Sequence, residues 1–187
     1  MSQSLLLNIV RESITEVLES QSTINKQALY QDYPVLKEHI ASFVSIYFHD
    51  ELRGSMGSVL PTRPLLDDII HNAKSAAFQD PRFTPLKTSE YLQSSLELSL
   101  LTQAKELEYT CLDDIKKQVH IGDDGLIIKL GNKEASLLPQ AWAQLENFED
   151  FFFHLLHEAE LTEHDISQHP LILSFQVEKQ IDKPILN

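Results

Sequence analysis

The residues best suited to bind or transform a ligand gather in one hexapeptide, Leu52-Arg53-Gly54-Ser55-Met56-Gly57. Its glycines allow either a positive φ or the close approach of another group to the backbone. An arginine beside exposed glycine backbone can hold a carboxylate or phosphate through bidentate hydrogen bonds and free N–H groups. We therefore predict that this segment is a loop that carries an anion or small-ligand pocket, formed by Arg53, Gly54, Ser55, Gly57, Arg63 and Arg82. The alternative is a tight turn between strands, in which the arginines pair with nearby acids.

The charge distribution singles out the same region. The 187 residues carry 15 Lys and Arg against 28 Asp and Glu, a net charge of −13. Between Arg53 and Lys87, however, five basic residues stand against three acidic ones, whereas the stretch from Glu134 to the end has a net charge of −8. A chain of −13 is a poor partner for nucleic acid or an anionic membrane. A nucleic-acid function would therefore need the one basic segment to form a face of its own.

Two residues of this region could support catalysis. Ser55 could act as a nucleophile with a base nearby, although its flanking glycines lack the spacing of a nucleophile elbow. Asp67 and His71 lie four residues apart on a predicted helix, where they form either a general-base pair or an exposed ion pair. Ser55 and His71 are therefore the catalytic candidates. The alternative to a non-catalytic binding protein is an enzyme that acts on a small anionic substrate with Arg53, Ser55, His71 and Arg82.

We predict no metal or cofactor site in this sequence. His154, His157 and Glu158 share a polar helix face with Asp150, but their order is not the His-Glu-x-x-His of a metalloprotease, and a solvated acidic face explains them. The single cysteine, Cys111, can form neither an intramolecular disulfide nor a thiolate metal site. The N-terminus has no basic region, and no window reaches ~20 apolar residues. We therefore expect a cytoplasmic protein without a membrane span.

Hydrophobic periodicity predicts the elements that must position these residues. We expect helices at residues 4–19, 26–30, 64–79, 113–118 and 147–159, and strands at 41–49, 96–100, 126–130, 135–138 and 171–177. Ser4 is expected to cap the first helix, and Gly131-Asn132 to form a hairpin turn. The strands come in hairpin-like groups between helices, which favours an α+β fold with a largely antiparallel sheet flanked by helices. Without a linker or repeat, residues 1–187 are predicted to form a single domain.

An ordered series of short motifs resembles one protein family. Residues 52–65 resemble its Leu-Arg-Gly-Cys-Ile-Gly signature and the Pro-x-Arg-Pro-Leu that follows it in bacterial members. Asp80-Pro81-Arg82-Phe83 and Leu138-Pro139-Gln140-Ala141-Trp142 resemble its Asp-x-Arg-Phe and Leu-Pro-Gln-Val-Trp segments. On these motifs, residues 5–180 resemble the AmmeMemoRadiSam system protein A family, also called the AMMECR-type domain.

The resemblance implies an α+β fold with a larger sheet-containing lobe and a smaller lobe, and it implies no known reaction. The family name records a genomic association with Memo-type and radical-SAM proteins, which are the expected partners besides a small anionic molecule. We therefore expect an accessory or binding protein of that pathway.

Two departures from the family pattern stand out. Ser55 stands where the family has cysteine, so a thiol mechanism at the signature is unavailable. Glu158-Ala159-Glu160-Leu161 stands where the family has Lys-Ala-Gly-Leu.

Overall fold

The computed structural model describes residues 4–186, which form two compact units. The first unit comprises residues 4–100 and 178–186, and the second comprises residues 101–177. Each unit is built around a four-stranded sheet. No change of composition marks the boundary in the sequence, and the single domain expected over residues 1–187 stays a prediction.

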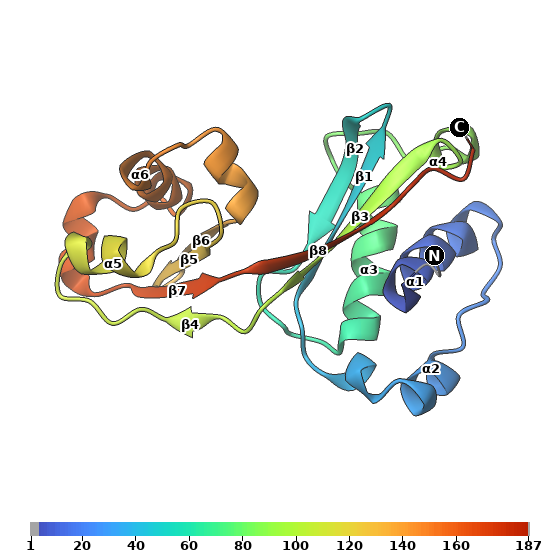
Figure 1. Ribbon diagram of the computed structural model, residues 1–187, viewed down its shortest axis with the longest axis horizontal. Coiled ribbons are helices and arrows are strands. Elements are labelled where there is room, and N and C mark those ends of the chain that lie inside the picture. Colours follow the sequence, from blue (N-terminus) through green and yellow to red (C-terminus); the bar gives the residue numbers. More distant parts are fainter. Residues whose placement is uncertain (1–3, 187) are drawn as a thin grey trace. The chain divides into compact units, whose positions relative to one another are not determined.

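The elements follow the order of Figure 1. Those centred on the first unit are α1 (Leu5–Leu18), α2 (Lys26–Asp32), η1 (Pro34–Lys37), β1 (Ser42–Phe48), β2 (Glu51–Gly57), α3 (Leu65–Phe78), α4 (Thr88–Tyr91), β3 (Ser94–Leu101) and β8 (Val177–Asp182). Those of the second are β4 (Lys105–Glu106), α5 (Leu112–Gln118), β5 (Gly125–Leu130), β6 (Lys133–Leu137), η2 (Pro139–Ala143), α6 (Phe148–Glu158), η3 (Glu163–Gln168) and β7 (Leu171–Phe175). Across residues 4–186, no helix is both long and apolar enough to cross a bilayer.

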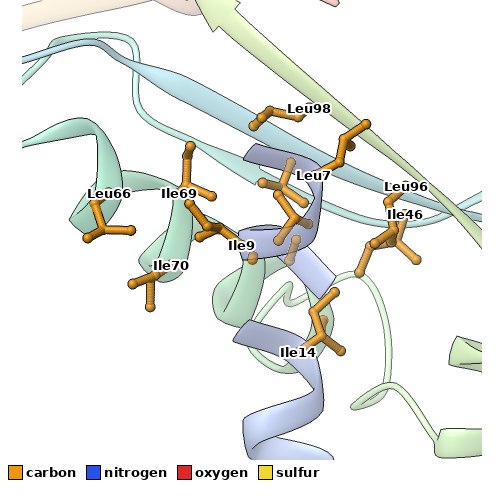
Figure 2. Packing of buried hydrophobic residues seen from close by; sticks show 14 of the residues in the cluster. Leu7, Ile9, Ile14, Ile46, Leu66, Ile69, Ile70, Leu96 and Leu98 are labelled. Carbon is orange, nitrogen blue, oxygen red and sulfur yellow. The ribbon is translucent and has the colours of Figure 1, made fainter. Parts of the chain in front are cut away.

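The first unit packs two helices against one face of its sheet. The strand order is β2-β1-β3-β8, and β1 runs antiparallel to both β2 and β3. Figure 2 shows apolar side chains of α1, α3 and the strands meeting in one core, among them Leu7, Ile9, Ile14, Ile46, Leu66, Ile69, Ile70, Leu96 and Leu98. Because successive strand residues point to opposite faces, the residues that alternate with Ile46 and Leu96 form an outer face of the sheet. The expected α+β fold with antiparallel sheets flanked by helices is confirmed.

Residue 54 must be glycine because β2 lies directly against α3. A Cβ atom on Gly54 would stand 2.2 Å from the backbone oxygen of Ala76, and one on Gly57 would stand 2.1 Å from the ring of Phe43. The glycines with positive φ in the described chain are instead Gly122 and Gly131. The signature glycines are therefore explained by the close approach of neighbouring groups to their backbone, and not by a positive φ angle.

The hexapeptide is a strand, which corrects the expectation of a loop at Leu52–Gly57. The reversal of the chain occurs just before it, at His49 and Asp50, whose φ angles are 52° and 63°. Both lie in the left-handed region, as a two-residue hairpin turn requires. The expected strand at 41–49 continues into this turn, and no glycine marks the turn in the sequence. For that reason the sequence predicted neither the turn nor the strand that follows it.

The second unit has the strand order β4-β7-β5-β6 and a core of aromatic residues from α6. Trp142 stacks on Phe151 with ring centroids 3.8 Å apart, and its indole N–H donates to the carbonyl of Asp124 at 2.7 Å. The predicted hairpin turn is confirmed, with Gly131 at a φ of 61° between β5 and β6. The predicted helices and the capping by Ser4 are also confirmed, with ends that move by one or two residues.

The last predicted strand is wrong in one respect. The segment expected at 171–177 ends at Phe175, and a second strand, β8, begins at Val177 and belongs to the other sheet. The alternation of apolar residues continues smoothly across this break, so periodicity alone does not reveal that the chain leaves one sheet and joins another.

The C-terminus of α6 carries a backbone strain that the family pattern lacks. Glu160 has a φ of 55°, in the left-handed region where residues with a side chain are disfavoured. At the end of the helix, the backbone N–H of Glu160 donates to the carbonyl of His157 at 2.9 Å, and that of Leu161 donates to the carbonyl of Leu156 at 2.8 Å. This is the place where the resembling family has glycine, the residue that adopts this conformation freely.

Gly54→Ala should destabilise the protein by about 3 kcal/mol, because the new methyl group meets backbone rather than a movable side chain. Urea unfolding of the purified variant measures this loss. Gly57→Ala is the matched comparison, since its neighbour Phe43 can rotate away, and it should cost about 1 kcal/mol. An equal loss in the two variants would contradict the close approach of β2 to α3 as the reason for Gly54.

Glu160→Gly should stabilise the protein by about 0.5–1 kcal/mol, because glycine relieves the left-handed strain while paying somewhat more backbone entropy. Thermal and urea unfolding measure the change. His154→Gly, at an exposed position inside α6, should instead destabilise by about 1 kcal/mol. A destabilised Glu160→Gly variant would show that the side chain of Glu160 matters more than its backbone angle.

Candidate functional site

The signature residues occupy the edge strand of the first unit's sheet. In the β1–β2 register Ile46 pairs with Gly54 and Tyr47 pairs with Leu52, which leaves Arg53 as the extra residue of a β-bulge. A bulge bends the strand and redirects the side chain that it carries. Ser55 pairs with Ser45, and their hydroxyl oxygens are 2.9 Å apart.

The segment after α3 completes this edge. The backbone N–H of Ser55 donates to Oδ2 of Asp80 at 2.9 Å, and Nη2 of Arg82 donates to the carbonyl of Ser55 at 3.4 Å. Edge strands present unpaired N–H and C=O groups that attract other strands. Asp80 and Arg82 therefore take the place of a neighbouring strand at Ser55.

Each of the two arginines at this edge is held by a carboxylate. Arg82 donates from Nε and Nη2 to the two oxygens of Asp80, at 3.0 and 2.7 Å. Arg53 binds Glu90 in the same bidentate manner, at 3.2 and 3.0 Å. Both guanidinium groups lie over the ring of Phe83, at 5.9 Å for Arg53 and 5.4 Å for Arg82. The structure thus brings together two of the predicted anion-binding residues, already paired with acids.

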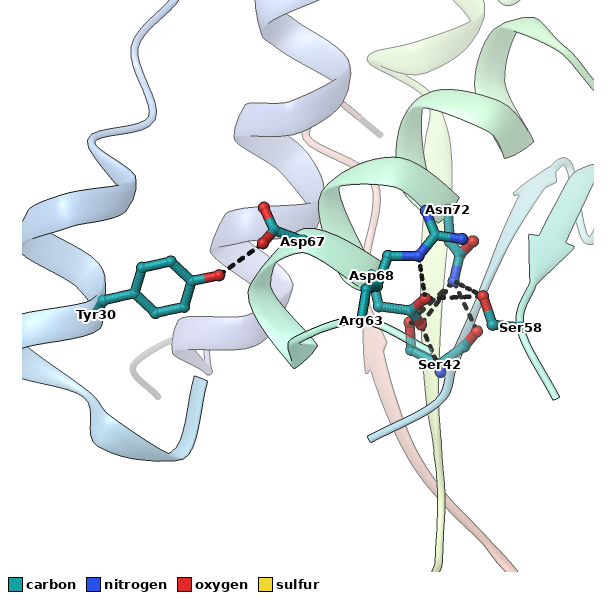
Figure 3. A network of polar contacts seen from close by, with 7 residues as sticks. All are labelled: Tyr30, Ser42, Ser58, Arg63, Asp67, Asp68 and Asn72. Atoms are coloured by element: carbon teal, nitrogen blue, oxygen red, sulfur yellow. Dashed lines mark hydrogen bonds and ion pairs between the residues drawn. The ribbon is translucent and has the colours of Figure 1, made fainter. Parts of the chain in front are cut away.

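Arg63 belongs to a different cluster, which surrounds the buried carboxylate of Asp68 (Figure 3). The Asp68 side chain accepts the N–H and the hydroxyl of Ser42, at 2.9 and 2.7 Å, and the hydroxyl of Ser58 at 2.8 Å. Asn72 donates to it at 2.9 Å, and Nε of Arg63 lies 3.2 Å away. Arg63 therefore offsets a buried negative charge at the ends of β1 and β2.

The catalytic candidates are not brought together. Among residues 4–186 the hydroxyl of Ser55 has only the hydroxyl of Ser45 as a side-chain partner, and His71 is exposed on α3 without a hydrogen bond to Ser55 or to Asp67. The Asp67 carboxylate instead accepts a hydrogen bond from the Tyr30 hydroxyl at 2.8 Å (Figure 3). It also accepts one from Nζ of Lys26 at 2.6 Å. The roles of Ser55 and His71 in catalysis stay predictions.

The electrostatics of these pairs follow from their contacts. The hydrogen bonds from Arg82 hold the pKa of Asp80 far below its ordinary value, against the opposite effect of burial. The hydrogen bonds from Arg53 likewise lower the pKa of Glu90. Burial and then the bond to Asp67 raise the pKa of Tyr30 to about 12. These carboxylates are ionised at neutral pH and neutralise the local excess of basic residues.

The acidic helix of the second unit behaves as an exposed face. His154 lies 3.7 Å from Glu158. The Asp150 carboxylate accepts a hydrogen bond from the amide of Asn147 at 2.7 Å, and the backbone N–H of Asp150 donates to Oδ1 of Asn147 at 2.9 Å. Within the described part of the chain, no three His, Cys, Asp or Glu side chains are placed to hold a metal ion. Cys111 is exposed just before α5.

Sequence reasoning missed the acidic partners in both clusters. Asp68 and Asn72 lie four residues apart among the apolar residues of α3, a position that signals a buried polar pair. Glu90 is 37 residues from Arg53 and has no comparable local signal.

Comparisons with known proteins agree on one family. The family model described as AMMECR1 matches residues 7–180. A protein of Methanothermobacter thermautotrophicus is 36% identical over 136 residues, which cover 72% of this chain and 69% of that protein. A protein of Aquifex aeolicus is 32% identical over 151 residues, covering 77% and 75%. The crystal structure of the uncharacterized protein PH0010 from Pyrococcus horikoshii is similar over 97% of this chain and 92% of that one, with a TM-score of 0.82 and 26% identity.

The Asp80–Arg82 pair should make stability depend on pH. Because the pKa of Asp80 is lowered in the folded state, the pair stabilises the protein above the ordinary value of 3.8, and this contribution is lost as pH falls below it. Asp80→Asn should cost about 1–3 kcal/mol at pH 7, as expected for hydrogen bonds to charged groups. Urea unfolding at several pH values should find this difference shrinking below pH ~4.

Asp32→Asn, an exposed aspartate of the same unit, is the control and should have little effect at any of these pH values. A loss for Asp80→Asn that stays constant down to pH ~2 would contradict the ionic nature of the pair.

Proposed function

Because this chain belongs to the AMMECR1 family, whose model matches residues 7–180, we propose that it is a non-catalytic binding protein that recognises an anionic group at Arg82. We call the surface formed by Arg82, Asp80, Phe83 and Ser55 the Arg82 site. The anion is a carboxylate or phosphate carried by a small molecule or by a partner protein. The similar crystal structure is that of an uncharacterized protein, so the function is inferred from the site itself.

One observation carries the proposal: Arg82 is exposed and at the same time held in place. Its side chain is 55% exposed, whereas the side chain of Asp80 that holds it is 2% exposed. Asp80 occupies Nε and Nη2, and among residues 4–186 no group bonds to Nη1. A guanidinium already fixed in this way loses little conformational entropy when it binds an anion.

The surroundings of Ser55 favour binding over catalysis. A serine nucleophile needs a base within hydrogen-bond reach. The hydroxyl of Ser55 instead meets the hydroxyl of Ser45 at 2.9 Å, on a strand whose edge is closed by Asp80. Serine in place of the family cysteine keeps a hydrogen-bond donor there, which suits a binding role.

The pathway and the partners are proposed from the family resemblance. The chain would be the A component of an AmmeMemoRadiSam system, and a Memo-type or radical-SAM protein is the partner to test first. An acidic segment of such a partner would meet the Arg82 site in the same way as a free anion.

The test is a calorimetric titration of the full chain with inorganic phosphate and with pyrophosphate at fixed ionic strength. Arg82→Gln should weaken binding at least tenfold, because a hydrogen bond to a charged group contributes about 1.5–3 kcal/mol. Arg82→Lys keeps the positive charge but loses the forked set of N–H donors. Its affinity for the probes should lie between that of Arg82→Gln and that of the wild type.

Lys37→Gln removes an exposed positive charge elsewhere on the same unit and is the matched control. Thermal unfolding confirms that each variant is folded. The proposal fails if wild-type protein binds neither probe at about 10 mM, because a Kd of that size corresponds to a binding free energy of only ~2.7 kcal/mol. It also fails if Lys37→Gln loses as much affinity as Arg82→Gln.

A further inference from the structure

A second candidate site lies on the first unit and shares no residue with the Arg82 site. A hollow of about 410 Å³ is lined by the β1–β2 turn, the start of β3 and the segment around the end of β8. Its volume is within the ~300–1,000 Å³ of small-molecule sites. Tyr47 and Ser95 are cross-strand partners on the outer face of the sheet and form its floor.

The walls of this hollow are held by contacts within the chain. On one side, His49 and Asp50 stand in a turn whose left-handed φ angles fix its shape. On the other side, Nη2 of Arg11 donates to the carbonyl of Lys183 at 2.6 Å, and the N–H of Leu186 donates to the carbonyl of Leu92 at 2.8 Å. A hollow with fixed walls binds a ligand without first having to order them.

The two walls carry opposite charges. Asp50 lines one wall and Lys183 the other, and neither has an ion-pair partner among residues 4–186. The acidic residues of the Arg82 and Asp68 clusters are paired, whereas these two residues of opposite charge line one hollow without an ion-pair partner among residues 4–186. A ligand that complements both walls must carry a positive group at one end and a negative group at the other.

Apolar and polar neighbours complete the lining. Ile181 is 65% exposed and Leu186 is 52% exposed, which is unusual for large apolar side chains that sit together beside a hollow. The amide of Gln93 and the hydroxyls of Tyr47 and Ser95 line the same space between the charged walls. The hollow therefore offers an apolar surface and a central group of hydrogen-bonding side chains.

The distance between the walls decides the length of the ligand. The turn wall follows β1 and the other wall follows β8, and both strands are neighbours of β3. Neighbouring strands lie ~4.8 Å apart, so these walls are ~10 Å apart. Two extended residues span about 7 Å, and the side chains of Asp50 and Lys183 reach across the remainder. A dipeptide therefore covers most of this distance by itself, whereas a single amino acid, with both charged groups on one carbon, would leave most of it to the two side chains.

We propose that this hollow binds a zwitterionic dipeptide with an apolar side chain. The ammonium of the dipeptide pairs with Asp50 and its carboxylate pairs with Lys183. The central amide meets Gln93 and Ser95, and the apolar side chain covers Ile181 and Leu186. This activity is additional to anion binding at Arg82 and does not depend on it.

The test is a calorimetric titration of the full chain with L-alanyl-L-leucine, with its N-acetylated form, with its C-terminal amide and with L-leucine. Wild-type protein should bind the free dipeptide more tightly than the other three. Lys183→Gln should weaken binding of the free dipeptide at least tenfold and leave binding of the C-terminal amide unchanged. Asp50→Asn should weaken binding of the free dipeptide at least tenfold and leave binding of the acetylated form unchanged. Each modified probe already lacks the charged group, carboxylate or ammonium, that pairs with the residue replaced.

Lys105→Gln and Asp123→Asn change the same charges at exposed positions of the second unit and serve as matched controls. The proposal is overturned if wild-type protein does not bind the dipeptide at about 10 mM. It is also overturned if L-leucine binds as tightly as the dipeptide, or if the control variants lose as much affinity as Lys183→Gln and Asp50→Asn. Circular dichroism of each variant establishes that losses arise in a folded protein.

Discussion

The buried carboxylate of Asp68 ties together the three elements on which the first unit depends. It is inaccessible to solvent, and a buried charge is tolerated only when its oxygens are fully hydrogen-bonded and a counter-charge lies near. Ser42 at the start of β1, Ser58 after β2 and Asn72 on α3 supply the hydrogen bonds, and Arg63 supplies the charge. Because moving any one of these elements would leave the carboxylate without partners, the cluster determines how α3 sits on β1 and β2.

That placement brings α3 so close to β2 that only glycine fits at residue 54, and it delivers the segment after α3 to the edge of the sheet. There Asp80 and Arg82 satisfy the backbone of Ser55, where another strand would otherwise pair. The same pair leaves one side of the Arg82 guanidinium exposed to solvent. Closure of the sheet edge and exposure of the Arg82 guanidinium are thus two results of one arrangement, and this is the basis on which we propose a binding role for a structural arginine.

The positive segment of the sequence has a different meaning in the folded protein. Counting charges along the chain found an excess of basic residues between Arg53 and Lys87, but acids from outside that segment offset it. Glu90 pairs with Arg53, and Glu16 pairs with Lys74 at 2.7 Å. Charges of both signs without an ion-pair partner among residues 4–186 line the hollow beside β8, where neither composition nor motif drew attention. The number of charges in a segment can be counted from the sequence. Which of those charges lack a partner depends on how the folded chain packs.

The sequence by itself determined the family, most helices, the β5–β6 hairpin and the residues of the signature, because periodicity, turn residues and motif spacing are local properties of the chain. Only the tertiary structure decided that the signature is an edge strand with a bulge at Arg53, that Gly54 serves close packing, and that the chain changes sheets after Phe175. The bulge and the pairing of Arg53 with Glu90 depend on residues far apart in sequence. Such contacts form because packing brings those residues together, and no local pattern records them.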